Sequence, residues 1–286
     1  NMKRLMLCPI KKTGDIIVPE GVTCINDFAF YGARIDSITF PSSLKNIRKE
    51  AFRQSKIRKI DFGSGIEKIG DYASYIFADC HNLTHVEFPP QITDIGHGAF
   101  FNCSSLESVT MYEGISTIGL YAFDRCQKLK SVTLPKSIKY AGELSFSCVQ
   151  ELHAPHLFSG LPYAFLSAVS SSLVKKLIVE GNEFFVPASL SSIALHTLNQ
   201  QCRNGSLCKS DWHDLYQGAT STKLKQNTAY HIYKQSPRAD AELEKYLRRC
   251  AKQIALRYMK ENKDDEFAEF IGFKLLSKST IKQLLQ

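Results

Sequence analysis

The sequence has little tryptophan and methionine, with one and four residues among 286, and it has no long apolar segment without chain breakers. The longest stretch without Lys, Arg, Asp or Glu is 152–174, and it contains two prolines, a glycine and five serines. A transmembrane helix needs about 20 predominantly apolar residues, so this stretch is a poor candidate. We therefore expect no transmembrane segment and interpret 152–174 as a buried, irregular part of the fold.

Motifs of the common enzyme classes are also missing. The sequence contains no P-loop, no GxSxG nucleophile turn and no HExxH zinc motif. His85 and Glu87 form the most enzyme-like pair, but an exposed pair without a nucleophile usually belongs to the surface. We therefore expect no enzymatic activity, no catalytic residues and no cofactor, with an enzyme acting through His85 as the third-ranked alternative.

Nine cysteines are present, but no two of them form the short CxxC pair of many zinc sites. His196, Cys202, Cys208 and His213 are separated by five, five and four residues, and four such side chains could bind zinc. Because the short pair is absent and the segment has partly helical spacing, we expect no metal site.

No signal peptide is recognisable at the N-terminus, since no charged start precedes an apolar core and a small-residue cleavage site. We expect any export signal to lie upstream or not to exist. The cysteines do not indicate the compartment either, because free thiols also serve as small apolar fillers.

Repetition is the dominant feature of the sequence. GHGAFFNCSSLESV begins at Gly96, and GLYAFDRCQKLKSV begins 23 residues later at Gly119. Three registers recur at similar spacing: Phe30, Phe52, Phe100, Phe123 and Phe146; Ile38, Ile60, Val86, Val109 and Val132; and Cys80, Cys103, Cys126 and Cys148. A period of 20 to 29 residues indicates a solenoid, and at least six units run from about Asp15 to about Leu152.

One unit shows how the chain is expected to wind. Alternation directs Val86 and Phe88 inward and His85 and Glu87 outward, which predicts a short strand. A bend and a short helical or 3₁₀ turn around Phe100 follow. Successive coils stacked at about 4.8 Å would bury ladders of Ile/Val, Phe and Cys. One unit is longer by three residues, and we expect 74–76 to bulge from it.

Helical spacing replaces alternation beyond Ala188. Ser236 and Pro237 predict a helix start, and Leu243, Leu247, Cys250, Ile254 and Tyr258 form one apolar stripe along that helix. Residues 264–266 and Ser277 or Ser279 predict two further helix starts. The chain is thus expected to have a solenoid domain, 1–187, and an all-α region, 188–286, that caps the last coil.

The repeats resemble the BspA-like, or Treponema-type, leucine-rich repeat family. The resemblance is carried by IVPEGVTCINDFAF from Ile17, FPPQITDIGHGAFFNCSSLESV from Phe88 and LPKSIKYAGELSFSCVQEL from Leu134. It covers about half of the chain and implies a curved, mostly right-handed α/β solenoid of short parallel strands. It also implies a binding role, because the family is often found on the surfaces of bacteria and some protists and is associated with adhesion and host proteins.

The leading hypothesis is a non-enzymatic protein-binding module, which family resemblance would place on a bacterial surface or in secretion, with a host or extracellular matrix protein as ligand. The expected binding face consists of the outward strand positions Ser37, Thr39, Lys59, Asp61, His85, Glu87, Ser108, Thr110, Ser131 and Thr133. The other interpretation of these residues is a solvated sheet without a partner.

Charge supports one alternative. Residues 1–199 carry 20 basic and 18 acidic side chains, a net charge of +2, whereas 200–286 carry 16 and 10, a net charge of +6. The alternative is an intracellular scaffold whose basic helical tail binds a partner or nucleic acid. A second basic cluster comprises Arg34, Lys45, Arg48, Lys49, Arg53, Lys56, Arg58 and Lys59. We do not expect nucleic acid binding, because no aromatic residues accompany these charges in the usual way.

Overall fold

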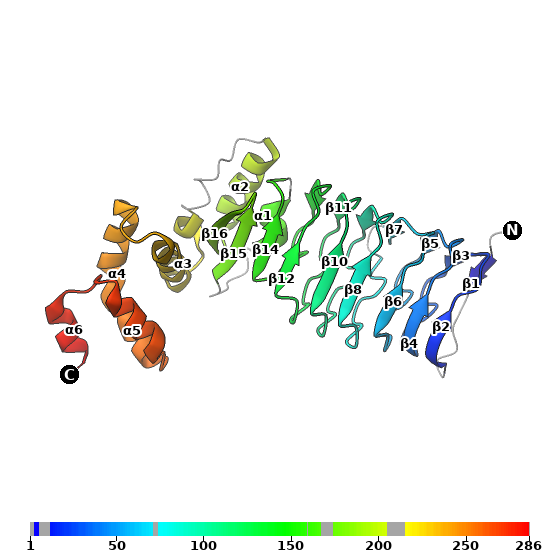
Figure 1. Cartoon of the computed structure of the whole chain (residues 1–286), viewed down its shortest axis with the longest axis horizontal. Helices are drawn as coiled ribbons and strands as arrows, with labels where there is room; N and C mark the ends of the chain where they lie inside the picture. Colours follow the sequence, from blue (N-terminus) through cyan, green and yellow to red (C-terminus); the bar gives the residue numbers. More distant parts are fainter. Residues whose placement is uncertain are drawn as a thin grey trace.

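The computed structural model describes residues 3–5, 12–70, 74–158, 160–166, 174–204 and 215–285. The N-terminal part of the chain winds into a row of coils, most of which contribute one longer and one shorter strand (Figure 1). Helices follow at the C-terminal end of the row (Figure 1). The protein is therefore the α/β solenoid that the repeats predict.

Two rows of strands run along the solenoid. The long-strand row contains β2 (Thr13–Ile17), β4 (Arg34–Thr39), β6 (Lys59–Asp61), β8 (His85–Phe88), β10 (Ser108–Met111), β12 (Ser131–Thr133), β14 (Glu151–Ala154), β15 (Val174–Val179) and β16 (Asn182–Pro187). The short-strand row contains β1 (Lys3–Leu5), β3 (Val22–Ile25), β5 (Asn46–Ile47), β7 (Lys68–Ile69), β9 (Asp94–Ile95), β11 (Thr117–Ile118) and β13 (Tyr140–Ala141). Paired strands are parallel, except that β15 and β16 form an antiparallel hairpin that ends the array.

A third set of backbone hydrogen bonds joins the turns that carry the Phe residues. In each coil the N–H of the Phe donates to a carbonyl of the next coil, as in Phe100 to Ala122 at 2.9 Å. The same bond recurs in the pairs Phe30–Ala51, Phe52–Ile76, Phe77–Ala99, Phe123–Ser145 and Phe146–Ala164. This turn-side ladder therefore continues without a break from Phe30 to Ala164.

The strand rows are less continuous than the turn-side ladder. Within the described residues, no ladder pairs β5 with β7, β6 with β8, or β10 with β12. At the last of these breaks Val109 is only partly buried, whereas its counterparts Val86 and Val132 are buried. Each break lies at a different junction between coils, so each of these three junctions keeps the turn-side ladder and one strand ladder.

Aromatic rings form a continuous stack inside the solenoid. Phe30, Phe52, Phe77, Phe100, Phe123 and Phe146 are almost fully buried. Successive ring centroids lie 4.7, 5.0, 5.3, 5.4 and 5.8 Å apart, with interplanar angles of 19° or less. The predicted Phe ladder is confirmed. Phe77 also belongs to it, although the additional residues of its coil place it outside the regular spacing of the repeat.

Two details of the predicted repeat are wrong. Ser74 and Ile76 do not bulge: both are buried, and Ile76 occupies the position that Ala99 holds in the next coil. The turn-side register assigns the three additional residues to 71–73, which lie outside the described residues. Cys148 does not continue the thiol column, because it lies two residues after its Phe instead of three and Val149 is buried there instead.

The remaining thiols of the column are buried between coils. The Sγ atoms of Cys80, Cys103 and Cys126 donate to the carbonyls of Phe52, Phe77 and Phe100 at 3.2, 3.1 and 3.3 Å. Burial raises the pKa of Cys103 and Cys126 far above that of an exposed thiol, so both stay protonated. All seven described cysteines are free, and these three act as small packing residues with a weak donor.

A buried lysine closes the core at the end of the array. Lys175 has the same inward direction on β15 as Leu177 and is only 3% exposed. Its Nζ donates to the carbonyl oxygens of Phe146, Ser147 and Phe165 at 3.3, 3.0 and 2.5 Å. It also lies 4.4 Å from the centroid of the Phe165 ring. Burial lowers the pKa of Lys175 to about 7, since desolvation disfavours the ammonium form.

The helices divide between two buried clusters. α1 (Leu161–Phe165) and α2 (Ser192–Asn204) pack on the solenoid, and Leu195, Leu198 and Cys202 belong to its core. α3 (Thr222–Gln235), α4 (Ala241–Lys260), α5 (Asp264–Gly272) and α6 (Lys278–Leu284) bury a second cluster. The division into domains at 187/188 stays a prediction. No helix of the described residues is both long and apolar enough to span a membrane.

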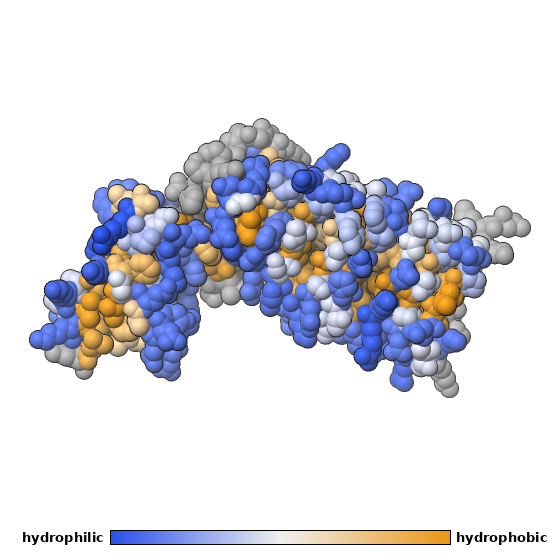
Figure 2. Space-filling model, viewed as in Figure 1, coloured by the Kyte–Doolittle hydropathy of each residue, from blue (hydrophilic) through white to orange (hydrophobic). Residues whose placement is uncertain are grey.

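The apolar stripe of α4 is confirmed, but its predicted start is wrong. Leu243, Leu247, Cys250, Ile254 and Tyr258 are all buried. Ser236 ends α3, whereas the Asp240 carboxylate accepts from the N–H of Leu243 and caps α4. The predicted starts of α5 at residue 264 and of α6 after Ser277 are confirmed. Apolar residues also gather on the surface over α5 and α6, where Leu285 is 67% exposed (Figure 2).

We expect Phe100→Ala to lower the free energy of unfolding by about 3 to 5 kcal/mol, because it opens a cavity between two stacked rings. Phe28→Ala is the matched control, since Phe28 is 45% exposed and should cost less than about 1 kcal/mol. Urea unfolding followed by circular dichroism measures both. Equal losses in the two variants would contradict the stack as the main source of stability.

Lys175 predicts a pH dependence of stability. Its pKa is about 7 in the folded protein and 10.5 ordinarily, so between these values the unfolded chain holds a proton that the folded chain lacks. The contribution of Lys175 to the free energy of unfolding should therefore rise with pH from about 7, by up to about 1.4 kcal/mol per pH unit, and be flat below that. Urea unfolding at pH 7.0 to 8.5 should show a slope in the native chain that is steeper, by up to this amount, than the slope in Lys175→Met. An identical slope in both proteins contradicts the assignment to Lys175.

Candidate functional site

The ten side chains predicted to form a binding face lie on one side of the long-strand row. They occupy β4, β6, β8, β10 and β12, two on each strand, and none of them is buried. The residues between them, such as Ile38 and Val132, are buried in the core. The structure therefore brings these ten residues together on one face, while their role in binding stays a prediction.

Strand register arranges this face in two lines. Ser37 pairs with Lys59, His85 with Ser108, and Ser131 with Glu151 in the first line. The second line pairs Thr39 with Asp61, Glu87 with Thr110, and Thr133 with His153. Register extends both lines beyond the predicted residues to Asp15, Ile17, Glu151, His153, Lys176 and Ile178. We call the ten predicted and these six additional residues the strand face.

The additional residues were missed for two different reasons. Asp15 and Ile17 lie on a strand with regular alternation, but Ile17 is apolar and 78% exposed. An apolar residue predicts an inward position, so the sequence pattern did not mark Ile17 as an outward residue. His153 and Lys176 belong to coils in which the Cys signal is lost and the regular spacing of the Phe register ends. Alternation in β14 and β15 was the signal that could have placed them.

Charge is engaged unevenly along the strand face. At its N-terminal end the Ser37 hydroxyl bonds Asp15 at 2.5 Å, and at its C-terminal end Lys176 reaches Glu151 at 3.9 Å. Between these ends, on β6, Lys59 and Asp61 are exposed and form no ion pair within the described residues, although Oδ1 of Asp61 accepts from the Gly63 N–H at 2.9 Å. These two side chains are therefore available to charged groups of a partner.

Glu87 is held by a residue that sequence analysis did not select. The Tyr112 hydroxyl donates to Oε1 of Glu87 at 2.8 Å, from the segment that follows β10. This bond to a carboxylate raises the pKa of Tyr112, because the carboxylate stabilises the protonated phenol and repels the phenolate. His85 is likewise positioned by a bond of 2.8 Å between its Nδ1 and the Ser108 hydroxyl.

The second line of the strand face leads into a hollow of about 730 Å³. Thr133, His153 and Ile178 are consecutive members of that line and also line the hollow. Its other lining residues are Met111, Glu113, Leu134, Pro135, Lys136, Ala154, Pro155, His156, Glu180 and Gly181. The mixture of apolar and polar groups gives a partner both an area to bury and groups to bond.

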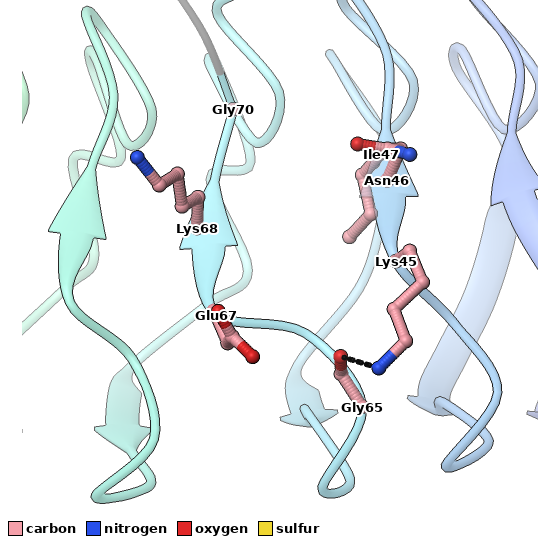
Figure 3. Close-up of a pocket in the computed structure, with 7 residues that line it drawn as sticks. All are labelled: Lys45, Asn46, Ile47, Gly65, Glu67, Lys68 and Gly70. Atoms are coloured by element: carbon pink, nitrogen blue, oxygen red, sulfur yellow. Dashed lines mark hydrogen bonds between the residues drawn. The ribbon is translucent and has the colours of Figure 1, made fainter.

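A smaller hollow of about 180 Å³ lies on the short-strand row, where β5 and β7 are not paired (Figure 3). Lys45 Nζ crosses toward the next coil and donates to the Gly65 carbonyl at 3.1 Å (Figure 3). Lys68 and Glu67 line the opposite side. This hollow belongs to the other strand row and is separate from the strand face.

Only two of the four side chains considered as zinc ligands lie within the described residues. His196 is exposed and bonds the Tyr163 hydroxyl, and Cys202 is buried in the solenoid core. Cys208 and His213 lie outside the described residues. Among the residues that the structure describes, no group of three or more His, Cys, Asp and Glu side chains is arranged to hold a metal ion.

Sequence comparison identifies the family. A family model described as a BspA-type leucine-rich repeat region matches residues 8–75 and 73–192, in six copies. The two segments together span more than half of the chain. The chain therefore belongs to the BspA-type leucine-rich repeat family, as its repeats predict. No curated protein matches the chain.

Several solved structures with detectable similarity are leucine-rich proteins. A leucine-rich cell surface protein from Faecalibacterium prausnitzii is 29% identical, over 46% of this chain and 33% of that chain, with a TM-score of 0.38. A leucine-rich repeat protein of T. pallidum is 27% identical, over 48% and 68%, with a TM-score of 0.44. A leucine-rich repeat protein from Eubacterium ventriosum is 23% identical, over 47% and 43%, with a TM-score of 0.40. The match thus spans about a third of the F. prausnitzii protein.

We expect Glu87→Gln to lower the pKa of Tyr112, because the variant removes the carboxylate that accepts its proton. Nuclear magnetic resonance of a chain labelled at tyrosine Cζ can follow the titration of the single Tyr112 signal. Glu107→Gln removes a different exposed carboxylate, on the same coil as Tyr112 but bonded to Lys128, and should leave this pKa unchanged. A Tyr112 titration that is the same in native and Glu87→Gln proteins would refute the bond.

Proposed function

We propose that the protein is a non-enzymatic protein-binding module and that the strand face is its binding surface. The observation that supports this most is the pair Lys59 and Asp61, which are exposed on β6 without ion-pair partners among the described residues. Ser37 and Thr39 flank this pair on the preceding strand, and such short side chains can bond a partner at little cost in side-chain entropy. Membership of a leucine-rich repeat family favours protein interaction as the role of such a surface.

We further propose a bacterial surface or secreted location, with a host or extracellular matrix protein as the ligand. Support for this location and this ligand comes from membership of the BspA-type leucine-rich repeat family. The polar character of the strand face suits a wet interface with a charged centre, in which charges set specificity and the association rate.

The test begins with a binding screen against purified extracellular matrix proteins, using the whole chain. The double charge reversal Lys59→Glu with Glu87→Lys is then measured against any confirmed ligand. We expect the affinity to fall on the order of tenfold or more, because like charges would face each other across the interface. Surface plasmon resonance measures the affinity and the association rate.

Lys139→Glu with Glu143→Lys is the matched control, since both residues are exposed and lie off the strand face. It changes no net charge, as in the test variant. An unchanged affinity of the test variant in a confirmed complex would exclude the strand face. An equal loss in the control would show a nonspecific effect of charge and would also contradict the proposal.

The alternative is an intracellular scaffold that binds through its basic helical tail. Several basic side chains there already pair with carboxylates, including Lys223 with Glu261 at 2.7 Å and Lys234 with Glu269 at 2.6 Å. This pairing reduces the charge available to a polyanion. A steep fall of affinity with salt, unaffected by the strand-face reversal, would favour the tail over the strand face.

A further inference from the structure

The basic cluster of the first coils separates into engaged and unengaged side chains. Arg48 pairs with Asp27, Lys49 with Glu50, Arg58 with Asp36, and Arg53 with both Glu50 and Asp79, while Lys45 bonds a backbone carbonyl. Within the described part of the chain, the side chains of Arg34, Lys56 and Lys59 form no hydrogen bond or ion pair. Lys59 belongs to the strand face, so Arg34 and Lys56 are left unexplained.

Arg34 and Lys56 line the same hollow. Its volume is about 630 Å³, and its lining residues are Gly32, Arg34, Arg53, Gln54, Lys56, Asp79 and His81. Arg34 and Lys56 hold matching positions on adjacent coils, each four residues before a buried isoleucine, so their backbones lie about one strand spacing, 4.8 Å, apart. The Lys56 N–H donates to the Ala33 carbonyl at 2.8 Å, which fixes this register.

The single acidic residue among those that line the hollow already has both oxygens bonded. Oδ2 of Asp79 accepts from Nε of Arg53 at 2.9 Å, and its Oδ1 accepts from Nδ2 of Asn102 at 2.7 Å. Glu50 binds the other side of Arg53 at 3.0 Å. Arg53 is therefore held between two carboxylates. The residues that line the hollow include three cations and one acid, a net charge of +2, and Arg34 and Lys56 are the two cations without a partner in the described part of the chain. Two adjacent cations without a counter-charge repel each other, and a bound anion would remove this repulsion.

The lining also restricts what kind of anion fits. The residues that line this hollow include no Phe, Tyr or Trp side chain, so the bases of a nucleic acid would find only the small His81 ring to stack on. They include no large apolar side chain either, so an amphipathic acidic peptide would bury little area. Gln54 and His81 supply groups that can bond hydroxyls, and an Arg guanidinium can bind two oxygens of one oxyanion.

We propose that this hollow binds a sulfate ester of an acidic glycan, with Arg34 and Lys56 as the ligating cations and Gln54 and His81 beside the sugar hydroxyls. The site lies on the edge of the first coils and is distinct from the strand face, so it would add glycan binding to a protein-binding module. Either property can be present without the other.

The first test measures binding of a sulfated heparin-derived hexasaccharide to the whole chain at fixed ionic strength, by isothermal titration calorimetry. Arg34→Ser with Lys56→Ser should lower the affinity roughly tenfold or more, because it removes two charge-assisted contacts. Lys130→Ser with Lys139→Ser removes two exposed charges elsewhere and should change the affinity by less than about twofold, because screening weakens distant charges. Both variants should melt at the native temperature, since the substituted side chains are exposed.

A second variant keeps both cations and alters only the hollow. Gln54→Glu places a negative charge in the lining and should weaken hexasaccharide binding severalfold. Gln127→Glu makes the same change at an exposed position of a later coil and should not. Unchanged affinity in Arg34→Ser with Lys56→Ser, or equal losses in test and control variants, overturns the proposal. Equal binding of the desulfated hexasaccharide, of single-stranded RNA or of poly-glutamate at the same charge also overturns the assignment to sulfate esters.

Discussion

Every coil of this protein depends on its neighbours, because a single coil leaves its apolar side chains exposed on the surfaces that the adjoining coils cover. The interaction that meets this need from Phe30 to Ala164 is the turn-side ladder, together with the Phe stack that runs inside it from Phe30 to Phe146. The strand rows of the described residues are interrupted at three places, and the turn-side ladder is present at each of them. The polar strand face is thus carried by a scaffold whose continuity lies on the turn side.

Ending such an array is a separate problem, since the last coil still offers carbonyl oxygens to a coil that does not follow. Within the array, thiols donate to these oxygens, as Cys126 does to Phe100. At the end, the Lys175 ammonium donates to three carbonyls at once, including those of Phe146 and Phe165. The antiparallel strand β16 then covers the edge of β15. A donor with three hydrogens is suited to this place, although its burial costs free energy.

Much of the fold follows from the sequence because the repeat averages over several coils. A residue such as Phe123 is placed correctly since the same environment recurs on either side of it. Errors arise where one coil departs from the rest: a shift of one residue misplaced Cys148, and an insertion misplaced 74–76. Lys175 shares the inward parity of Leu177, so alternation would have indicated its burial. The hollow at Arg34 and Lys56 could not be read in advance, because it depends on which carboxylates reach which cations across coils.

The interruptions of the strand rows also matter for a molecule that is held at its ends. Where β5 and β7, β6 and β8, or β10 and β12 are unpaired, an axial load is shared by fewer hydrogen bonds than elsewhere in the described coils. Because each coil is bonded only to its neighbours, rupture at one weak seam leaves the segments on either side wound. Tension would then be released in steps, and the solenoid would lengthen one junction at a time before any one segment unwinds.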